Sequence, residues 1–369
     1  MPKESEITIV DVAREAGVSV STVSRILNNK PDVAVSTRQR VLKVIAELGY
    51  TPHVQAQRLA GGKSRTIALH YPLDYLTFTQ QEMGFINGVG NALAGADFFF
   101  NLITTPITPD SLMRLFNQGQ VDGIIIMEID LDDWRVQLLL EHDFPFVMIG
   151  RREDNTGLNF VDMMPANDIL TIFQHLVEDL GHREIGFFTF PKRLLDRGYA
   201  AGVRMMMGYD EVIAKYGLER ICAHAELDTK FIYQATRAFL EQHPHLTAAV
   251  TVEGATAVGV IQAVRETGRR IPDDFSLVTI TPRQTAEFIR PNLTHIDFPS
   301  YDIGYQAAQM LIKILNKEPL EVSQILFQPD LIIRESTAPA PGLSQNSQGK
   351  RQKVVAAEVS APLTTRLID

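Results

Sequence analysis

The sequence predicts two kinds of domain in one chain, a small all-α head and a larger α/β core. The 369 residues are 45% hydrophobic and 21% charged, which allows a sizeable core and favours more than one domain. Up to about residue 62, short segments with helical spacing of apolar residues are interrupted by glycines. From residue 64 onward, apolar runs of strand length alternate with helical patterns, as in α/β proteins.

The basic residues are concentrated in the head. Residues 1–65 contain 10 Lys and Arg against 6 Asp and Glu, a net charge of +4, although the whole chain carries −9. A basic segment on an acidic protein suggests that this segment meets a polyanion. The single cysteine, Cys222, excludes an intramolecular disulfide and Cys-based zinc sites. With no signal-like run and no stretch of about 20 apolar residues, we expect a cytoplasmic protein that does not enter the membrane.

The head begins with two short helices around a glycine. Thr8 is placed to cap a helix over residues 9–16, with Asp11 in the capping-box position. Gly17 supplies a sharp turn, and Ser19 caps a second helix that reads VSTVSRIL. The side chains expected to face inward are Val12, Ala13, Ala16, Val23, Ile26 and Leu27. Two short helices joined in this way form a helix-turn-helix.

The second helix has the residues that a DNA-reading helix needs. It is short enough to enter a major groove as a rigid unit, and its small hydroxyls let the backbone approach phosphates and base edges. Arg25 adds a bidentate donor for guanine. An amphipathic helix that only packs is the alternative. A third helix is expected over Thr37–Leu48, capped by Ser36 and ended by Gly49.

The core pattern predicts parallel sheets covered by helices on both faces. The strand-like runs are TIALHYP, FFFNLIT, DGIIIM, FPFVMIG, EIGFFTF, AAVTV and FSLVTI. The intervening helical patterns end at or near a glycine. Beyond about Pro339 the chain is rich in Pro, Gly, Ser and Gln, which predicts a disordered tail over residues 339–369.

Motifs along most of the chain resemble the lac repressor (LacI/GalR) family. In the head they are TIVDVAREAGVSVSTVSRILN, TRQRVLKVIAELGYTP and AQRLAGGKS, and in the core GHREIGFF and AVRETGRRIPDDFSLV, up to about Arg334. The resemblance implies a helix-turn-helix domain over residues 1–52, a hinge helix and linker over 53–63, and an effector-binding and dimerisation domain over 64–338. That domain would be periplasmic-binding-protein-like, with two Rossmann-like subdomains joined by crossovers near Val161, Leu293 and Leu326.

The same resemblance assigns roles in DNA binding. It implies that Val20 and Ser21 choose bases, and that Thr22, Ser24 and Arg25 belong to the part of the helix that contacts phosphates and a base. The remaining phosphate contacts would be Thr8, Ser19, Asn28 and Tyr50. In the hinge, Leu59 with Ala56 beside it would wedge into a base step from the minor groove, which bends the duplex. The hinge departs from the family at His53 and Gln57, where Asn and Arg are common.

The effector pocket departs further from the family. Sugar-binding members carry Asn-Asp where this chain has Glu253-Gly254, and an Asp where it has Thr281. Arg197 is the candidate for the family's pocket arginine, although strict register places Tyr199 there. We therefore expect Arg197, Glu253 and Thr281 to line the cleft. Either Glu253 recognises the hydroxyls of a sugar, or Arg197 meets an anionic, non-sugar ligand.

An enzyme is the less favoured class. The sequence has no Walker loop or Gly-x-Ser-x-Gly elbow, and the nine His show no metal-ligand spacing. A periplasmic sugar-binding protein is a third class, which the basic head and the missing signal peptide argue against. We expect a repressor that binds a near-palindromic operator as a homodimer and answers a small effector, most simply a sugar, with no cofactor and no metal. The tail has prolines and no heptads, so no tetramer is expected through it.

Overall fold

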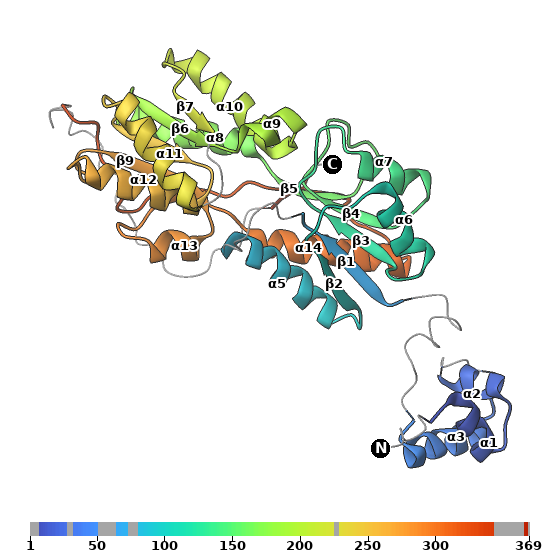
Figure 1. Cartoon of the computed structure of the whole chain (residues 1–369). Helices are drawn as coiled ribbons and strands as arrows, with labels where there is room; N and C mark the ends of the chain where they lie inside the picture. Colours follow the sequence, from blue (N-terminus) through green and yellow to red (C-terminus); the bar gives the residue numbers. More distant parts are fainter. Residues whose placement is uncertain are drawn as a thin grey trace. The chain divides into compact units, whose positions relative to one another are not determined.

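The computed structural model of this chain describes residues 7–27, 32–50, 64–72, 80–224, 229–342 and 365–367 (Figure 1). The chain divides into two compact units. One comprises Met1–Thr66 with Asp110–Asp122, and the other Ile67–Pro109 with Gly123–Asp369. The expected boundary at residue 64 lies close to this division, but residues 110–122 group with the first unit. In the described part of the chain, no helix is both long and apolar enough to cross a membrane.

The first unit contains the expected helix-turn-helix. Its N-terminal helices are α1 (Ile9–Ala16), α2 (Val20–Leu27) and α3 (Val35–Leu48). The capping box forms, because the Thr8 N–H donates to Asp11 Oδ2 at 3.0 Å while Thr8 Oγ1 accepts from the Asp11 N–H. Gly17 ends α1 in the left-handed region, with φ of 61°, which a residue with a Cβ adopts only at a cost. These local signals therefore act as predicted.

The head packs around one apolar cluster, and one expected cap is wrong. Ser19 caps α2, since its Oγ accepts from the Thr22 N–H at 3.1 Å. Ser36 does not cap α3. That helix starts at Val35 behind Ala34, which has no side-chain cap, so Ser36 already lies in the first turn. The buried residues are Val12, Ala13, Ala16, Val23, Ile26, Val41, Val44 and Tyr50, with Leu27 packed at their edge.

The second unit contains two sheets. Among the described residues, seven strands form one sheet in the order β13-β11-β5-β4-β3-β1-β2, and six form the other in the order β12-β10-β9-β8-β6-β7. The strands of the first are β1 (Thr66–His70), β2 (Phe99–Ile103), β3 (Gly123–Ile126), β4 (Phe146–Ile149), β5 (Phe160–Met163), β11 (Gln324–Phe327) and β13 (Thr365–Leu367). Those of the second are β6 (Ile185–Thr189), β7 (Cys222–His224), β8 (Ala248–Thr251), β9 (Ser276–Thr281), β10 (Thr294–Asp297) and β12 (Leu331–Ile332).

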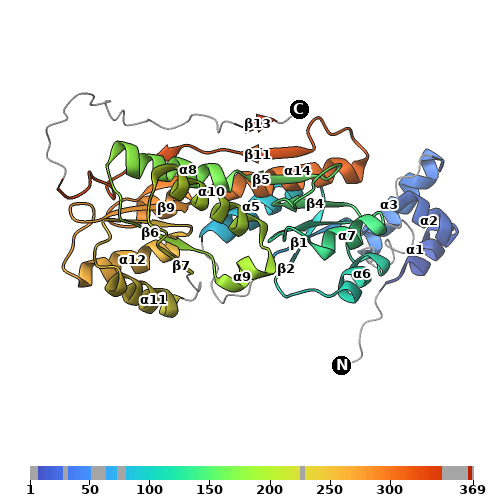
Figure 2. The same ribbon diagram turned by 90° about the horizontal axis from the view of Figure 1, so that it is seen from above.

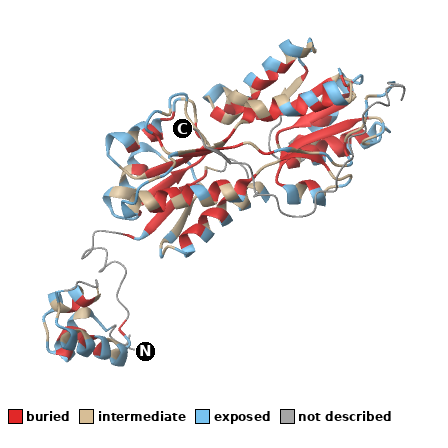
Figure 3. Ribbon diagram, turned by 180° about the vertical axis from the view of Figure 1, so that it is seen from behind, coloured by how far each residue is buried: buried red, intermediate tan, exposed pale blue. Residues whose placement is uncertain are grey.

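The strand pairings confirm the α/β prediction. β1, β3, β4, β5 and β11 pair in parallel, as do β6, β7, β8, β9 and β10, and the antiparallel partners β12 and β13 lie at sheet edges. The central strands of both sheets are buried (Figure 3). Burial on both faces explains why they read as continuous apolar runs in the sequence.

Helices cover the two sheets. The first sheet has α5 (Gln80–Ala94), α6 (Pro109–Asn117) and α7 (Trp134–Glu141), which follow its strands, and α14 (Ser300–Asn316), which follows β10 of the second sheet but packs against β3, β4 and β5. The second sheet has α8 (Pro165–Gln174), which continues as a π-helical turn over His175–Asp179, and α9 (Lys192–Arg197), α10 (Ala200–Tyr216), α11 (Thr229–Gln242), α12 (Gly254–Glu266) and α13 (Arg283–Phe288). In the views of Figures 1 and 2, α5 and α14 lie side by side.

Glycines allow α5 and α14 to approach closely. A Cβ on Gly88 of α5 would lie 2.1 Å from the backbone oxygen of Tyr301 in α14, and one on Gly304 would lie 2.5 Å from the backbone oxygen of Phe85. No side-chain movement can relieve a clash with backbone atoms. Gly88, the first glycine of the run GVGNALAG, therefore serves helix packing together with Gly304.

The chain passes between the two sheets three times. It crosses after β5, after β10 and after β11, each within a few residues of the positions named from the sequence. Two parallel sheets connected by three segments leave the ends of their strands facing a common cleft.

Two short parts of the segment expected to form the tail contact the core. The Ala340 N–H donates to the Leu180 carbonyl at 2.8 Å, and β13 pairs antiparallel with β11 through residues 365–367 (Figure 2). The open edge of β11 supplies unpaired backbone groups that this strand satisfies. His182 of the GHREIGFF motif is fully buried and contacts the Ser276 hydroxyl and the Ala338 carbonyl, each at 3.0 Å, so it ties this segment to the core.

Candidate nucleic-acid interface and ligand cleft

The start of α2 presents an exposed face. Val20 is 40% exposed, and Thr8, Ser19, Ser21 and Arg25 are also exposed. Thr22 and Ser24 are half-buried. Opposite this face Val23 and Ile26 are buried in the head core. The side chains expected to read bases therefore lie on the solvent side of a helix whose other side is anchored.

The polar groups of this face already contact one another. The Ser19 hydroxyl lies 2.8 Å from those of Ser21 and Thr22. Arg25 forms an ion pair with Asp32. Both partners are about half exposed, so the pair can separate at little cost when a phosphate or a base competes for the guanidinium.

Tyr50 differs from the other predicted DNA contacts because it is buried, and three further predicted residues lie outside the part of the chain that the structure describes. The Tyr50 ring is 6% exposed and packs in the head core, and burial raises the pKa of its hydroxyl. Its predicted phosphate contact thus requires the hydroxyl alone to reach the surface. Asn28, Ala56 and Leu59 lie outside the described residues, so their roles stay predictions.

A cavity of about 100 Å³ lies between the two sheets of the core. The first sheet contributes Tyr71 after β1, Glu128 after β3 and Asp162 of β5, and the second contributes Glu253 after β8 and Ile280 of β9. These positions are the carboxyl ends of parallel strands, where open α/β sheets bind ligands. Apolar walls come from Phe85, Met127, Ile129, Phe190, Leu194, Val252 and Phe298.

The polar part of this cavity consists mainly of carboxylates. Among the described residues that line it, none is a Lys, Arg or His, whereas the acidic residues are Glu82, Glu128, Asp162, Asp168 and Glu253. Hydroxyl or amide donors come from Tyr71, Tyr199 and Gln81. The cavity therefore accepts hydrogen bonds more readily than it donates them.

Three of the five carboxylates have partners. Asp162 accepts from Arg151 Nε at 3.0 Å, and the Tyr71 hydroxyl donates to Glu82 Oε1 at 3.3 Å. Glu128 lies 3.6 Å from Arg197 Nη2. A second cation lies beside Arg151, because Arg204 donates a hydrogen bond to the Arg151 backbone carbonyl at 2.9 Å.

Glu253 and Asp168 hold their protons more tightly than ordinary carboxyls. Burial, with the nearby charges of Glu82 and Glu128, raises the pKa of Glu253 to about 8. Burial, with the charge of Asp162, raises the pKa of Asp168 to about 8. Desolvation and like charges both disfavour the ionised form. Titratable groups perturbed in this way concentrate at functional sites.

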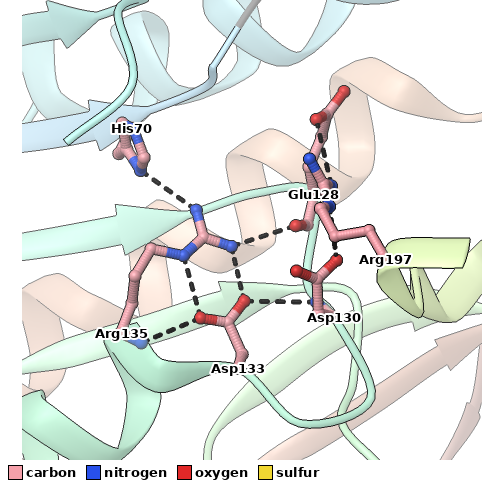
Figure 4. A network of polar contacts seen from close by, with 6 residues as sticks. All are labelled: His70, Glu128, Asp130, Asp133, Arg135 and Arg197. Atoms are coloured by element: carbon pink, nitrogen blue, oxygen red, sulfur yellow. Dashed lines mark hydrogen bonds and ion pairs between the residues drawn. The ribbon is translucent and has the colours of Figure 1, made fainter. Parts of the chain in front are cut away.

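Arg197 belongs to a network beside the cavity rather than to its lining (Figure 4). Its Nε donates to Asp130 Oδ1 at 2.9 Å, and its charge also faces Glu128. In the same network the buried Arg135 contacts both carboxylate oxygens of Asp133 and donates to the Glu128 carbonyl at 2.9 Å. The loop that carries Glu128 is therefore held from both sides.

His70 completes the network as a neutral acceptor. Burial and the neighbouring Arg135 lower the pKa of His70 to about 4. Its Nδ1 lies 3.0 Å from Arg135 Nη1, which can only donate, so Nδ1 accepts and Nε2 carries the proton toward the Thr105 carbonyl at 3.3 Å.

The three predicted effector residues thus occupy different places. Glu253 lines the cavity, as does Tyr199, the alternative from strict register. Arg197 reaches the cavity only through Glu128. The structure does not place Thr281 in the lining, because successive side chains of β9 alternate in direction and Ile280 is the one that lines it. Thr281 is 2% exposed and lies against Gly254, where a Cβ would meet its hydroxyl at 2.7 Å.

Sequence reasoning missed four of the acidic lining residues. Glu128 and Tyr71 follow apolar strands. The rule that ligands bind at the carboxyl ends of parallel strands could therefore have found them. Asp162 lies within a short strand. Glu82 and Asp168 lie in helical first turns, where acidic residues ordinarily serve the helix dipole, so their positions carried no distinguishing signal.

The head and the core together define a class, namely helix-turn-helix proteins with a periplasmic-binding-protein-like core. Residues 8–53 match the model of the bacterial regulatory proteins of the lacI family, and residues 173–337 match a periplasmic binding protein-like domain. The HTH-type transcriptional regulator RegA of Clostridium saccharobutylicum is 30% identical over 338 residues, which cover 89% of this chain and 99% of RegA. This chain therefore belongs to the lacI family of bacterial regulatory proteins and is a DNA-binding transcriptional regulator rather than an enzyme.

Further relatives agree with this assignment. Catabolite control protein A of Priestia megaterium is 29% identical, covering 90% of this chain and 99% of the relative. A solved complex of the transcriptional regulator CelR with cellobiose superposes with a TM-score of 0.65 at 27% identity, covering 89% and 99% of the two chains. A lac repressor dimer bound to operator shares the fold, with a TM-score of 0.77 at 22% identity and coverage of 90% and 100%.

Proposed function

We propose that this chain is a cytoplasmic repressor that binds a near-palindromic operator as a homodimer and that a sugar or sugar derivative in the cleft changes its operator affinity. The observation that carries this proposal is the cleft itself. It is built from the strand ends of two sheets that three chain segments connect, in a chain that also has a helix-turn-helix. A ligand that contacts both sheets favours one relative arrangement of them, and a DNA-binding head can respond to such a change.

In the head, we assign base reading to Val20, Ser21 and Arg25, which are exposed on one helix. Backbone contacts fall to a larger set, namely Thr8, Ser19, Thr22, Ser24, Asn28 and Tyr50, with Ala56 and Leu59 in the minor groove. Two heads related by a two-fold axis would read two half-sites, so a dimer and a near-palindromic operator imply each other.

The sugar assignment is supported by relatives and by the cavity. The CelR structure contains cellobiose, and a further relative is named a ribose operon repressor. In this chain, Glu253 and the other carboxylates offer acceptors for sugar hydroxyls above apolar walls. The anionic alternative would need Arg197, whose guanidinium is already held by Asp130 and Glu128. An anion would also enter a cavity lined by five carboxylates.

The experiment begins with selection of an operator from randomised DNA by the full-length protein. Fluorescence anisotropy on the selected duplex is then followed while neutral mono- and disaccharides, and their phosphorylated and amino derivatives, are added. We expect two chains per operator and a change in apparent Kd with at least one sugar or derivative. Random-sequence DNA of equal length is the control. Binding of one chain per site would contradict the dimer, and a Kd that no compound changes would contradict the ligand-responsive role.

A further inference from the structure

The charge balance of the cleft is incomplete. Of its five carboxylates, Asp162 and Glu128 have ion pairs with Arg151 and Arg197. Glu253 makes no hydrogen bond or ion pair through its side chain with any described residue, although it faces Glu82 and Glu128. Glu253 is thus an acidic group with no cationic partner among the described residues.

Asp168 provides a second, independent sign of a missing partner. Its side chain is 2% exposed, and its buried Oδ2 has no hydrogen-bond partner. It lines the same cavity as Glu253 but on the side of Asp162. A buried carboxyl oxygen without a hydrogen-bond partner costs free energy, so its retention in a cavity is explained by a ligand that forms a hydrogen bond with it.

The spacing of these groups favours an organic ligand over a metal ion. Within the described residues, acidic and His ligand atoms converge within 4.8 Å only at Glu184, Glu219 and His245, which are partly or fully exposed and away from the cleft. The cleft carboxylates do not converge on one point. They suit a molecule whose donors are distributed along its length.

The hydrogen-bonding groups of a ligand further narrow the chemical class of effector that the cleft can bind. A sugar hydroxyl can exchange hydrogen bonds with the protonated carboxyls of Glu253 and Asp168, but it brings no positive charge to offset the like charges around Glu253. An ammonium group brings three donors and no acceptor, and its hydrogen bonds to carboxylates are charge-assisted. On the basis of the proposed function, in which the cleft is the effector site, we propose that the effector carries a protonated amine. It is an amino sugar or another polyhydroxylated amine whose ammonium group meets Glu253 and whose other donors meet Asp168.

This arrangement couples binding to proton release. The groups that face Glu253 are Tyr71 at the end of β1, Glu82 of α5 and Glu128 after β3, and none of them is a cation. An ammonium ion favours the ionised form of Glu253, whose pKa in the empty cleft is about 8. Below that pH, the carboxyl must lose its proton as the amine binds. A neutral ligand imposes no such requirement.

The test uses the full-length protein and matched ligand pairs. The pairs are D-glucosamine with D-glucose, D-galactosamine with D-galactose, and 1,4-diaminobutane with 1,4-butanediol, and N-acetyl-D-glucosamine serves as a neutral amide. Thermal shift ranks each pair at pH 7. Calorimetry in two buffers of different protonation enthalpy then counts the protons released. We expect at least one amine to bind about tenfold or more tighter than its neutral partner, with net proton release.

Two variants test whether Glu253 in the cleft causes the preference for an amine over its neutral partner. Glu253→Gln should bring the amine and its neutral partner to equal affinity, whereas Glu211→Gln, on the exposed face of α10, should leave the preference unchanged. Operator binding without ligand is measured on each variant to show that it is folded. The proposal is overturned if no amine binds better than its neutral partner, including the case in which no amine binds. Neutral sugars that still change operator affinity would then leave the proposed function intact.

Discussion

Replacing Asp168 by Asn should change how the stability of the core depends on pH. The carboxyl of Asp168 is buried and has an unpartnered oxygen, and its pKa is about 8, against an ordinary value of 3.8. Since the folded pKa exceeds the unfolded one, its contribution to stability is fully present below about pH 4 and is lost as the pH rises through 8. The facing groups are Asp162 and, beyond it, Arg151.

The size of this change in unfolding free energy follows from the pKa shift of Asp168. Each pKa unit corresponds to about 1.4 kcal/mol, and most of the interval between the two values lies between pH 5 and pH 8. Over that range the wild-type protein should lose about 2–4 kcal/mol of unfolding free energy through this one group. The Asp168→Asn protein has no proton to exchange there. Its unfolding free energy should therefore fall by correspondingly less, whatever constant change the amide itself introduces.

Urea unfolding at pH 5 and pH 8 measures this difference. The chain's single tryptophan, Trp134, lies in the same compact unit as Asp168, so its fluorescence reports on the core. The matched control is Asp330→Asn, an exposed carboxylate just before β12, which should behave as wild type. If Asp168→Asn and wild type lose equal stability between the two pH values, then Asp168 is not protonated in the folded cleft and the reasoning fails.

Three further predictions concern the head, the hinge and the core. Exchanging both Val20 and Ser21 should change the operator selected from randomised DNA while salt-dependent non-specific binding persists, and an unchanged selected sequence would refute base reading by these residues. Leu59→Ala should weaken specific binding by about 1–3 kcal/mol and reduce DNA bending in a gel assay with little change in thermal stability; wild-type affinity and bend would exclude a wedge. Gly88→Val should lower the melting temperature of the core by several degrees, because the new side chain would meet the Tyr301 backbone. The control Gly90→Val should have a smaller effect, since only the Phe100 ring lies near that position. Equal melting temperatures of the two variants would contradict close packing of α5 and α14.

Much of the head was predictable because its signals are local. Thr8, Asp11, Gly17 and Ser19 act on backbone groups within a few residues, so their roles can be read from spacing alone. The same logic failed at Ser36, where the helix begins two residues earlier than expected and no side chain caps it. Helix ends are marked by competing choices of nearly equal energy, and the surrounding packing decides between them.

The core was predictable as a pattern and not as a site. Apolar runs alternating with helices indicated buried parallel strands, and the family resemblance pointed to Glu253, which lines the cleft. The same resemblance pointed to Thr281 as well, but one residue along a strand reverses the direction of a side chain, and Ile280 lines the cavity instead.

The head, the alternation of strands and helices in the core and the family of the chain could all be predicted from the residues alone, because they depend on short-range patterns. Only the tertiary structure decided the chemistry of the cleft. Arg197 meets Asp130 across 67 residues of chain, and strands β6, β7 and β8 separate Asp168 from Glu253 in the sequence. Whether a charged residue has a partner depends on which distant segments fold against it. The unpartnered carboxylates could therefore be recognised only once the two sheets were in place.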